Sequence, residues 1–220
     1  MSDSKYTDLT EAMVQRYSER LKTFGRTVQT LGWGSDEQQL YRFQQANVLL
    51  GSVAEGSLLD IGCGFGDYWR FLNDNGFESA SYVGWDINPD LISQCEEAWA
   101  EDSRASFHVL NLAVDEVPLH PVADFGIMLG VLNLNFHGTP DNLEYSKFMI
   151  RQAFSAVKKS LVVDFLSTQH DPGYRPEDFV FYHQPSVILD FSLQLTPHVS
   201  MHHDYASIPQ REFMVRLDKA

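Results

Sequence analysis

Cysteine is scarce in this sequence of 220 residues, which contains only Cys63 and Cys95. Two cysteines supply neither the disulfide framework of a secreted domain nor the paired CxxC motifs of a zinc site. We therefore expect both to be buried thiols in a protein of a reducing compartment.

Basic residues are also few, because 16 lysines and arginines stand against 30 aspartates and glutamates, a formal net charge of −14. A surface this negative repels the phosphates of nucleic acids and of anionic lipids. Lys158 and Lys159 form the only basic cluster of the sequence. The charge balance predicts a small-molecule partner, with no nucleic acid and no membrane, and it predicts no particular oligomeric state.

Long hydrophobic runs are missing as well. The longest uncharged, apolar-rich stretch, FGIMLGVLNLNF at 125–136, is far shorter than the ~20 residues that cross a bilayer. The first residues, MSDSKYTDLTEAM, are polar and acidic, unlike a signal peptide. With 44% hydrophobic and 21% charged residues, the composition is that of a globular domain with a full core. We expect a soluble cytoplasmic protein.

Apolar residues near the N-terminus recur at helical spacing, which predicts a helix over residues 8–31, interrupted by Gly25 and by LGWGSD at 31–36. Ser35 or Asp36 would cap a second helix that continues to Leu50. We expect this helical pair, residues 1–54, to be a unit separate from residues 55–220. The recurring residues are Leu9, Met13, Tyr17, Leu21 and Phe24.

From residue 57 onward, short apolar stretches alternate with helical ones. This alternation predicts parallel strands joined by right-handed crossovers that cover both faces of a sheet. Two final strands joined by a short loop, at 198–205 and 211–219, predict a closing antiparallel pair. The other predicted strands cover 57–62, 81–87, 106–112, 123–131 and 160–166, and the predicted helices cover 66–75, 89–100 and 143–158.

The first predicted strand leads into a glycine-rich loop, LLDIGCGFGDYWRFL at 58–72. Ligands of open α/β sheets bind beyond the carboxyl ends of the strands, where this loop lies. A carboxylate at Asp60 would repel the pyrophosphate of a dinucleotide, but it suits an amino group or a sulfonium. Asp86, which closes the second strand, can accept from both ribose hydroxyls. The pattern favours S-adenosylmethionine over NAD.

With these motifs, residues 57–219 resemble the class I S-adenosylmethionine-dependent methyltransferases. The resemblance implies a Rossmann-like, doubly wound α/β fold with a seven-stranded, mostly parallel sheet and a final antiparallel strand. It places Asp86 at the ribose, and it implies that the cofactor is S-adenosylmethionine. The remaining cofactor-binding residues that it implies are Asp60, Gly62, Gly64 and Gly66 at the methionine end, Ile87, Asn111 and Leu112 at the adenine, and Leu129 and Gly130 between methionine and substrate.

A narrower resemblance extends to the N-terminus. The stretches RYSERLKTFG, LGWGSDEQQLYRFQ, LGVLN and HHDYASIPQREFMVRL look like a subgroup of small bacterial members of the class. Some class I relatives in nonribosomal-peptide gene clusters convert S-adenosylmethionine to azetidine-2-carboxylate and release methylthioadenosine. The resemblance therefore implies two chemistries, methyl transfer and cyclisation.

Sulfonium alkylation asks for in-line geometry and a dry pocket rather than a catalytic triad. Tyr17 and Trp33, on the predicted helical lid, can offer aromatic faces to the cation. Arg42 can hold the methionine carboxylate. Asn133 and Tyr205 are the further candidate catalytic residues, because both are expected near the substrate.

The stretch MHHDY at 201–205 invites a metal interpretation. Adjacent residues of a strand point to opposite faces, so His202 and His203 cannot readily share one ion, and we expect no metal site. His137 and His170 follow strands at the same edge of the sheet. Either could act as a general base, but we expect both to be solvated loop histidines.

The sequence as a whole predicts an enzyme that binds S-adenosylmethionine and methylates a small metabolite under a lid formed by residues 1–54. Two alternatives stay open. One is a cyclase that forms azetidine-2-carboxylate and methylthioadenosine, and the other is a non-catalytic S-adenosylmethionine-binding protein.

Overall fold

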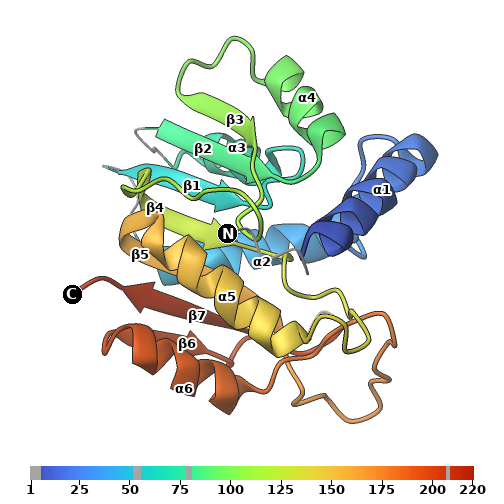
Figure 1. The fold of residues 1–220 in the computed structure, drawn as a ribbon, viewed down its shortest axis with the longest axis vertical. Coiled ribbons are helices and arrows are strands. Elements are labelled where there is room, and N and C mark those ends of the chain that lie inside the picture. The colour runs from blue at the N-terminus through green and yellow to red at the C-terminus, as the bar shows by residue number, and fades with distance from the viewer. Residues whose placement is uncertain (1–5, 52–55, 78–80, 207–208) are drawn as a thin grey trace.

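Seven strands form a single sheet in the order β3-β2-β1-β4-β5-β7-β6 (Figure 1). The computed structural model describes residues 6–51, 56–77, 81–206 and 209–220. The first five strands pair in parallel, whereas β7 runs antiparallel to both β5 and β6. The predicted α/β class, the mostly parallel sheet and the antiparallel closing pair are confirmed. The strands are β1 (Ser57–Ile61), β2 (Ser81–Asp86), β3 (Ala105–Val109), β4 (Ala123–Met128), β5 (Val157–Leu166), β6 (Val199–His202) and β7 (Glu212–Asp218).

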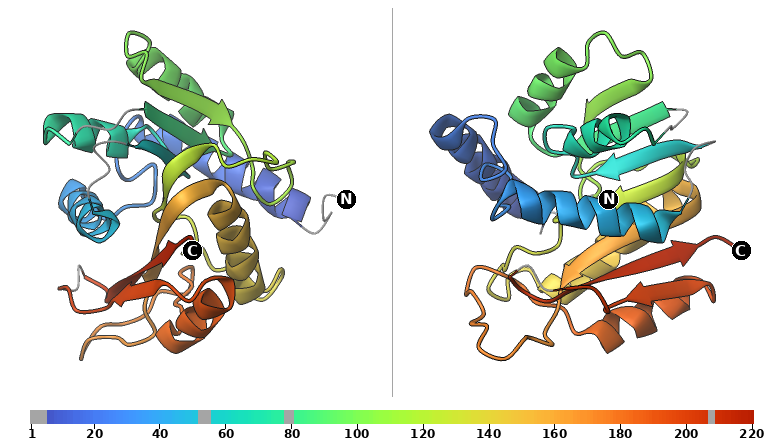
Figure 2. Two further views of the ribbon diagram at one scale, coloured as in Figure 1. Left: turned by 90° about the vertical axis from the view of Figure 1, so that its left-hand side faces the viewer. Right: turned by 180° about the vertical axis from the view of Figure 1, so that it is seen from behind.

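The helices cover both faces of this sheet, because each parallel crossover must cross a face (Figure 2). One face packs against α2, α3 and α4, and the opposite face packs against α5 and α6. Alternate residues of β1 serve the two cores, so Leu58 packs with the first group of helices and Leu59 with the second. The helices are α1 (Thr7–Phe24), α2 (Asp36–Leu50), α3 (Asp67–Asp74), α4 (Pro89–Ala98), α5 (Asn142–Ser155) and α6 (Pro185–Leu195).

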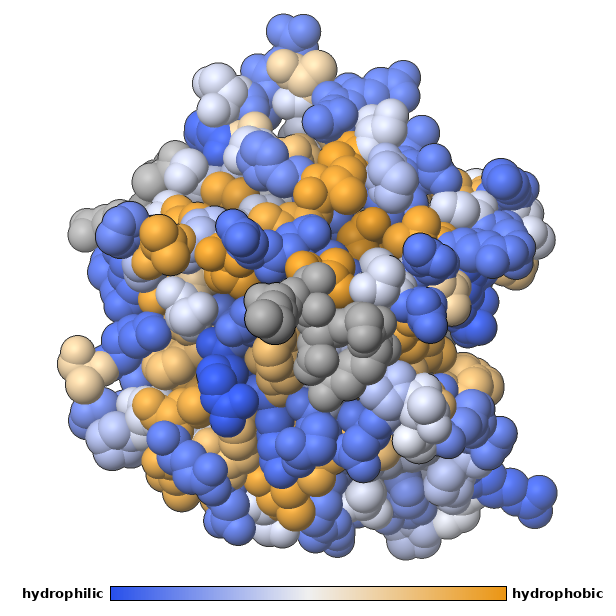
Figure 3. Space-filling model, viewed as in Figure 1, coloured by the Kyte–Doolittle hydropathy of each residue, from blue (hydrophilic) through white to orange (hydrophobic). Residues whose placement is uncertain are grey.

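The N-terminal helix α1 lies beyond the carboxyl ends of the parallel strands (Figure 1). It ends at Phe24, because Gly25 adopts a left-handed φ of 65° and its N–H caps the carbonyl of Leu21. The predicted continuation of this helix to residue 31 is therefore wrong. Where α1 projects from the body of the protein, its surface is mainly hydrophilic (Figure 3).

A turn, residues 25–35, joins α1 to α2, and Ser35 caps α2 as predicted by accepting from the N–H of Gln38 at 3.2 Å. The predicted boundary between residues 54 and 55 lies outside the described residues. No described helix is both long enough and apolar enough to span a membrane.

One helix was missed in the sequence. The helix α6 begins with Pro185, a residue that is favourable at the first helical position, and it buries Ile188 and Phe191 under the antiparallel end of the sheet. From Leu189 to Leu195 its apolar residues alternate with polar ones, a period of two that is typical of a strand and not of a helix. The predicted strand at 198–205 is shorter than expected, because β6 ends at His202.

Candidate functional site

A cavity lies where the carboxyl ends of β1, β2 and β4 meet α1 and the turn between the first two helices. Its walls are mainly apolar, and its polar groups are the backbone of the glycine loop, the carboxylate of Asp86 and the hydroxyls of two tyrosines. We call it the cofactor cavity. Its lining residues are Met13, Tyr17, Leu31, Trp33, Ile61, Gly62, Gly64, Trp85, Asp86, Ile87, Leu91, Leu110, Leu112, Leu129, Gly130, Val131, Tyr145 and Met149.

The glycine loop forms the floor of the cofactor cavity, and its backbone leaves no room for side chains. Gly64 has a φ of 55°, and a Cβ built there would lie 2.9 Å from both δ-carbons of Leu31. At Gly62, also left-handed, a Cβ would meet Val131. Gly66 instead begins α3, where a Cβ would meet Phe107, and it is not among the described residues that line the cavity. Positions 62 and 64 therefore require glycine for close approach.

Asp86 connects the glycine loop to the next helix. Its Oδ2 accepts from the N–H of Gly64 at 3.0 Å, and its Oδ1 accepts from the N–H of Asn88 at 2.9 Å. Burial raises the pKa of this carboxyl to about 6, against the opposing effect of these backbone donors. Each oxygen keeps a second lone pair, so the group can accept from a pair of ribose hydroxyls.

Asp60 lies beneath the cofactor cavity and not in its wall. It is buried on the α3 face of β1, where the hydroxyl of Tyr82 donates to its Oδ2 at 2.5 Å. Burial raises its pKa to about 7. Asp60 is not among the described residues that line the cavity, so its expected contact with the methionine end stays a prediction.

The adenine end of the cavity is apolar, with Ile87, Leu110 and Leu112 in its wall. Asn111 does not line the cavity within the described residues, and its side chain has other partners: its Nδ2 donates to Thr10 on α1, and its Oδ1 accepts from the N–H of Ala113 at 2.8 Å. Its expected contact with the adenine amino group stays a prediction. Leu110 was missed, since an apolar residue at the end of a strand has no signal that separates it from the core.

The N-terminal segment forms the roof of the cofactor cavity. Tyr17 and Trp33 both line it, and a Cβ built at Gly130 would lie 2.8 Å from the indole ring of Trp33. The pKa of Tyr17 is raised by burial and then by the negative charge of Asp86, which therefore lies near its hydroxyl. Leu31 was missed at this site, although it is the first residue of LGWGSD at 31–36, a segment within the predicted lid.

A buried ionic cluster lies behind Gly130. Arg42 pairs with Glu212, and its guanidinium carbon lies 4.8 Å from the ring centroid of Trp33. Oδ1 of Asp164 accepts from the N–H of Gly130 at 2.6 Å, and burial raises the pKa of Asp164 to about 6. The predicted role of Arg42 at the methionine carboxylate stays a prediction, since its guanidinium is already paired and it lines a different cavity.

Tyr205 belongs to this same ionic cluster. The charge of Asp164 adds to burial in raising the pKa of the Tyr205 hydroxyl. Among the described residues, no hydrogen-bond partner is found for that hydroxyl, for Nε of Arg42, for Oδ2 of Asp164 or for Oε2 of Glu212. Tyr205 lines neither cavity within the described residues, so its catalytic role stays a prediction as well.

A second, larger cavity of ≈ 630 Å³ adjoins the first, and we call it the acceptor-side cavity. Tyr17, Leu31, Trp33 and Gly130 line both cavities and so form a shared wall. The predicted residue Asn133 lines the second one, where its Oδ1 accepts from the N–H of Leu166 at 3.3 Å. The lining residues are Arg16, Tyr17, Arg20, Leu31, Gly32, Trp33, Gly34, Gln38, Arg42, Gly130, Asn133, Leu134, Leu166, Glu177, Phe179, Val180, Pro209 and Gln210.

Both cysteines and His203 lie outside the lining of the two cavities within the described residues. Cys63 and Cys95 are buried free thiols, as expected. Nε2 of His203 lies 2.8 Å from the hydroxyl of Ser167. In the described part of the chain, no three side chains of His, Cys, Asp or Glu come together as metal ligands would.

These groups suit S-adenosylmethionine. The apolar slot fits an adenine, Asp86 fits the ribose diol, and the aromatic roof is compatible with a sulfonium. The cofactor cavity measures only ≈ 100 Å³, below the ~300–1,000 Å³ usual for ligand pockets, so the roof must shift outward to admit the whole molecule.

Comparisons with known proteins agree with this assignment. Residues 58–159 match the family described as methyltransferase domain. The magnesium protoporphyrin IX methyltransferase of Synechocystis PCC 6803, solved with bound S-adenosylmethionine, has the same fold, with a TM-score of 0.63, 16% identity, and coverage of 98% of this chain and 97% of that chain. An S-adenosylmethionine-dependent methyltransferase from Mesorhizobium loti gives a TM-score of 0.57 at 14% identity, over 84% of this chain and 99% of that chain.

A curated relative is the tRNA U34 carboxymethyltransferase of Shewanella denitrificans, which is 28% identical over 134 residues. That match covers 60% of this chain but only 38% of the relative. Residues 58–159 therefore match a methyltransferase domain, and the chain as a whole has the fold of S-adenosylmethionine-dependent methyltransferases. The family match, the fold and the glycine loop together support S-adenosylmethionine as the cofactor.

Proposed function

We propose that this protein transfers the methyl group of S-adenosylmethionine to a small-molecule acceptor. The observation that carries the proposal is the acceptor-side cavity of ≈ 630 Å³, which meets the cofactor cavity at Tyr17, Leu31, Trp33 and Gly130. A methyl donor in one cavity and a nucleophile in the other would then face each other across this shared wall.

When bound, S-adenosylmethionine supplies an electrophilic methyl group. The acceptor's lone pair forms the new bond to the methyl carbon, the carbon–sulfur bond breaks, and its electron pair stays on sulfur as S-adenosylhomocysteine. Tyr17 and Trp33 surround the reacting centre and exclude water, which would otherwise compete for the methyl group. The proton of the acceptor leaves to solvent.

The residue roles in the proposal follow from where the side chains lie. Asp86 orients the ribose, and the bare backbone at Gly62 and Gly64 lets the methionine end approach. Asn133 faces the acceptor, since it lines the acceptor-side cavity and its Nδ2 has no partner among the described residues. We propose that residues 1–54 act as the lid, and that the protein works in the cytoplasm with both thiols reduced.

The competing functions make different products or need different partners. A cyclase needs no acceptor and so no second cavity, and it releases methylthioadenosine. A nucleic-acid methyltransferase is suggested by the name of the curated relative, but the net charge of −14 opposes the binding of polyanions. A non-catalytic binder would leave the cofactor unchanged.

The test is incubation of the pure protein with methyl-labelled S-adenosylmethionine in three mixtures: alone, with a low-molecular-weight metabolite extract, and with total tRNA. We expect S-adenosylhomocysteine and a labelled small product with the extract alone. Methylthioadenosine in the first mixture would instead establish cyclisation. Labelled tRNA would overturn the small-molecule acceptor, and unchanged cofactor in all three would contradict methyl transfer.

A further inference from the structure

Arginines gather at the acceptor-side cavity of a protein that is otherwise acidic. Arg16, Arg20 and Arg42 all line it, although the whole chain has only 16 lysines and arginines. Arg16 and Arg20 lie one helical turn apart on α1, so their side chains project from the same face of that helix. Glu177 is the acid of the lining.

Two of these three arginines have no carboxylate partner in the part of the chain that the structure describes. Arg42 is neutralised by Glu212. Arg20 donates instead to neutral carbonyl oxygens, those of Gln29 and Thr30, the latter at 3.1 Å. Within the described residues, no ion pair involves Arg16 or Arg20.

The positive charge of Arg16 also acts on Arg20. Burial, and next the charge of Arg16, lower the pKa of Arg20, while Tyr17 acts in the opposite direction. No ion pair between described residues compensates these two neighbouring like charges. Such a pair is stabilised by an anion that both can contact, and guanidinium groups bind carboxylate and phosphate with matched geometry.

The position of the pair relative to the cofactor fits an acceptor with two distinct ends. Tyr17 lies between Arg16 and Arg20 in the sequence and lines both cavities. An anionic group on the arginines would leave the other end of the molecule beside Gly130 and Trp33, where the methyl group arrives. Gln38, Asn133 and Gln210 supply uncharged polar contacts within the same cavity.

We infer, on the basis of the proposed function, that the methyl acceptor is a small molecule bearing an anionic group, a carboxylate or a phosphate, which Arg16 and Arg20 hold. The cavity volume of ≈ 630 Å³ suits a metabolite. A nucleic acid would need cationic groups along many phosphates, and this chain has a net charge of −14.

The experiment separates the metabolite extract on an anion exchanger into a retained and an unretained fraction, and then measures S-adenosylhomocysteine formation with each. We expect activity with the retained fraction. Phosphatase treatment of that fraction distinguishes the two anions, because a phosphate-bearing acceptor loses its activity and a carboxylate keeps it. Activity found only in the unretained fraction would overturn the anionic acceptor and leave methyl transfer standing, whereas no activity in either fraction would count against both.

Variants connect the anion to the two arginines. Arg16→Gln removes a charge that makes no hydrogen bond among the described residues, and we expect the KM for the retained fraction to rise at least tenfold, with kcat changed by less than about twofold. Arg20→Gln should also raise the KM for the retained fraction. Because Arg20 donates to carbonyls of the turn at residues 25–35, a thermal melting curve checks that this variant is still folded. The affinity for S-adenosylhomocysteine should not change in either variant.

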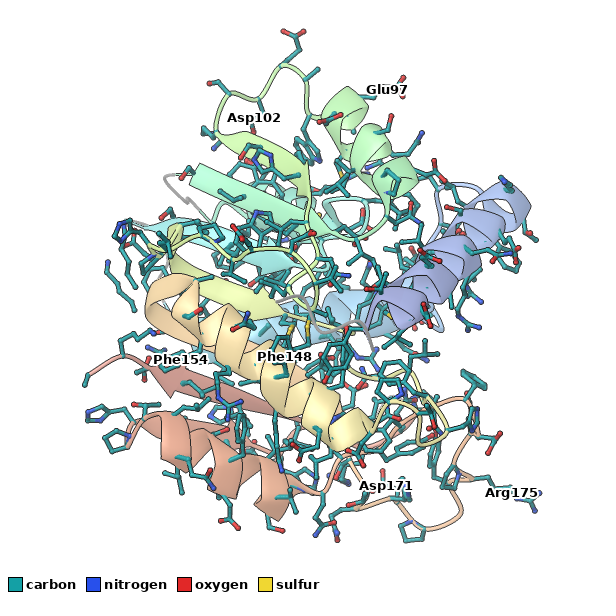
Figure 4. The ribbon with its side chains drawn as sticks, viewed as in Figure 1. Glu97, Asp102, Phe148, Phe154, Asp171 and Arg175 are labelled. Carbon is teal, nitrogen blue, oxygen red and sulfur yellow. The ribbon has the colours of Figure 1, made fainter. Side chains whose placement is uncertain are left out.

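The matched control is Arg175→Gln on the loop between β5 and α6. Arg175 is exposed and points away from the body of the protein at the edge of this loop (Figure 4), and it does not line the cavity. Its loss removes the same charge from a position outside the cavity lining, so KM should stay within about twofold of the wild type. An unchanged KM in Arg16→Gln, or an equal rise in Arg175→Gln, would refute specific binding by the pair.

Discussion

The backbone N–H of Gly64 donates a 3.0 Å hydrogen bond to Oδ2 of Asp86, which holds the glycine loop against the end of β2. Gly64 lies in the loop that follows β1, and Asp86 is the last residue of the neighbouring parallel strand β2; both line the cofactor cavity. One contact thus places the bare backbone of Gly64 beside a carboxylate. This pairing leads to the first two predictions.

Asp86→Ala should weaken S-adenosylhomocysteine binding at least ~100-fold, because each hydrogen bond from a ribose hydroxyl to the carboxylate contributes ~1.5–3 kcal/mol. Calorimetry measures the affinity. Asp74→Ala, at the exposed end of α3, is the control and should bind normally. Since burial raises the pKa of Asp86 to about 6, wild-type affinity should also fall as the pH is lowered through 6. Equal affinity in the Asp86 and Asp74 variants would remove Asp86 from the ribose.

Gly64→Ala should abolish cofactor binding, because the new Cβ would lie 2.9 Å from Leu31 at a φ of 55°. Gly76→Ala isolates the backbone cost, since Gly76 has a φ of 68° but no atom within 4 Å of the added carbon. That control should lose roughly 1–2 kcal/mol of stability and keep its affinity. If both variants bind alike, the loop is not the cofactor floor.

Asp60→Asn should stabilise the protein at pH 8 and have little effect at pH 4. The folded pKa of Asp60, about 7, lies above the ordinary value of 3.8, so the folded state favours the protonated acid. In the wild type, the stability that protonated Asp60 provides is fully present below pH 3.8 and is lost as the pH rises to 7. The amide replaces a buried charge and still accepts from Tyr82, and its gain at pH 8 is on the order of a few kcal/mol. Urea unfolding at pH 4 and pH 8 measures the free energy of unfolding of the variant and of the wild type. An equal gain in stability at both pH values would exclude the charge of Asp60 as the cause.

Residues 10–40 should exchange their amide hydrogens faster in the free protein than with S-adenosylhomocysteine bound. Leu31 packs on Gly64 and Trp33 on Gly130, so the roof must move to admit a ligand larger than the ≈ 100 Å³ cavity, and then close again. Hydrogen exchange by mass spectrometry reports this change, with β5 as an internal reference. Strong protection of residues 10–40 with and without ligand would show a fixed cover instead of a lid.

Local patterns carried most of the fold prediction. The spacing of apolar residues and the alternation of strands with helices specify a parallel sheet, because both periods are properties of the backbone. Ser35 predicted a helix start for the same local reason. The missed helix α6 shows the limit, since its residues from Leu189 to Leu195 alternate between apolar and polar with the period of a strand.

What the sequence by itself determined is the prediction of the cofactor class, because Gly62, Gly64 and Asp86 are recognised by glycine spacing and strand position, which are local features. Only the tertiary structure decided what lies around that loop. It paired Arg42 with Glu212, 170 positions away, and it turned Asp60 beneath the cavity toward Tyr82. Only the tertiary structure could show the acceptor-side cavity too, because its walls come from α1, the segments after β4 and β5, and the chain before β7. Such contacts depend on packing between distant elements, which no local pattern encodes.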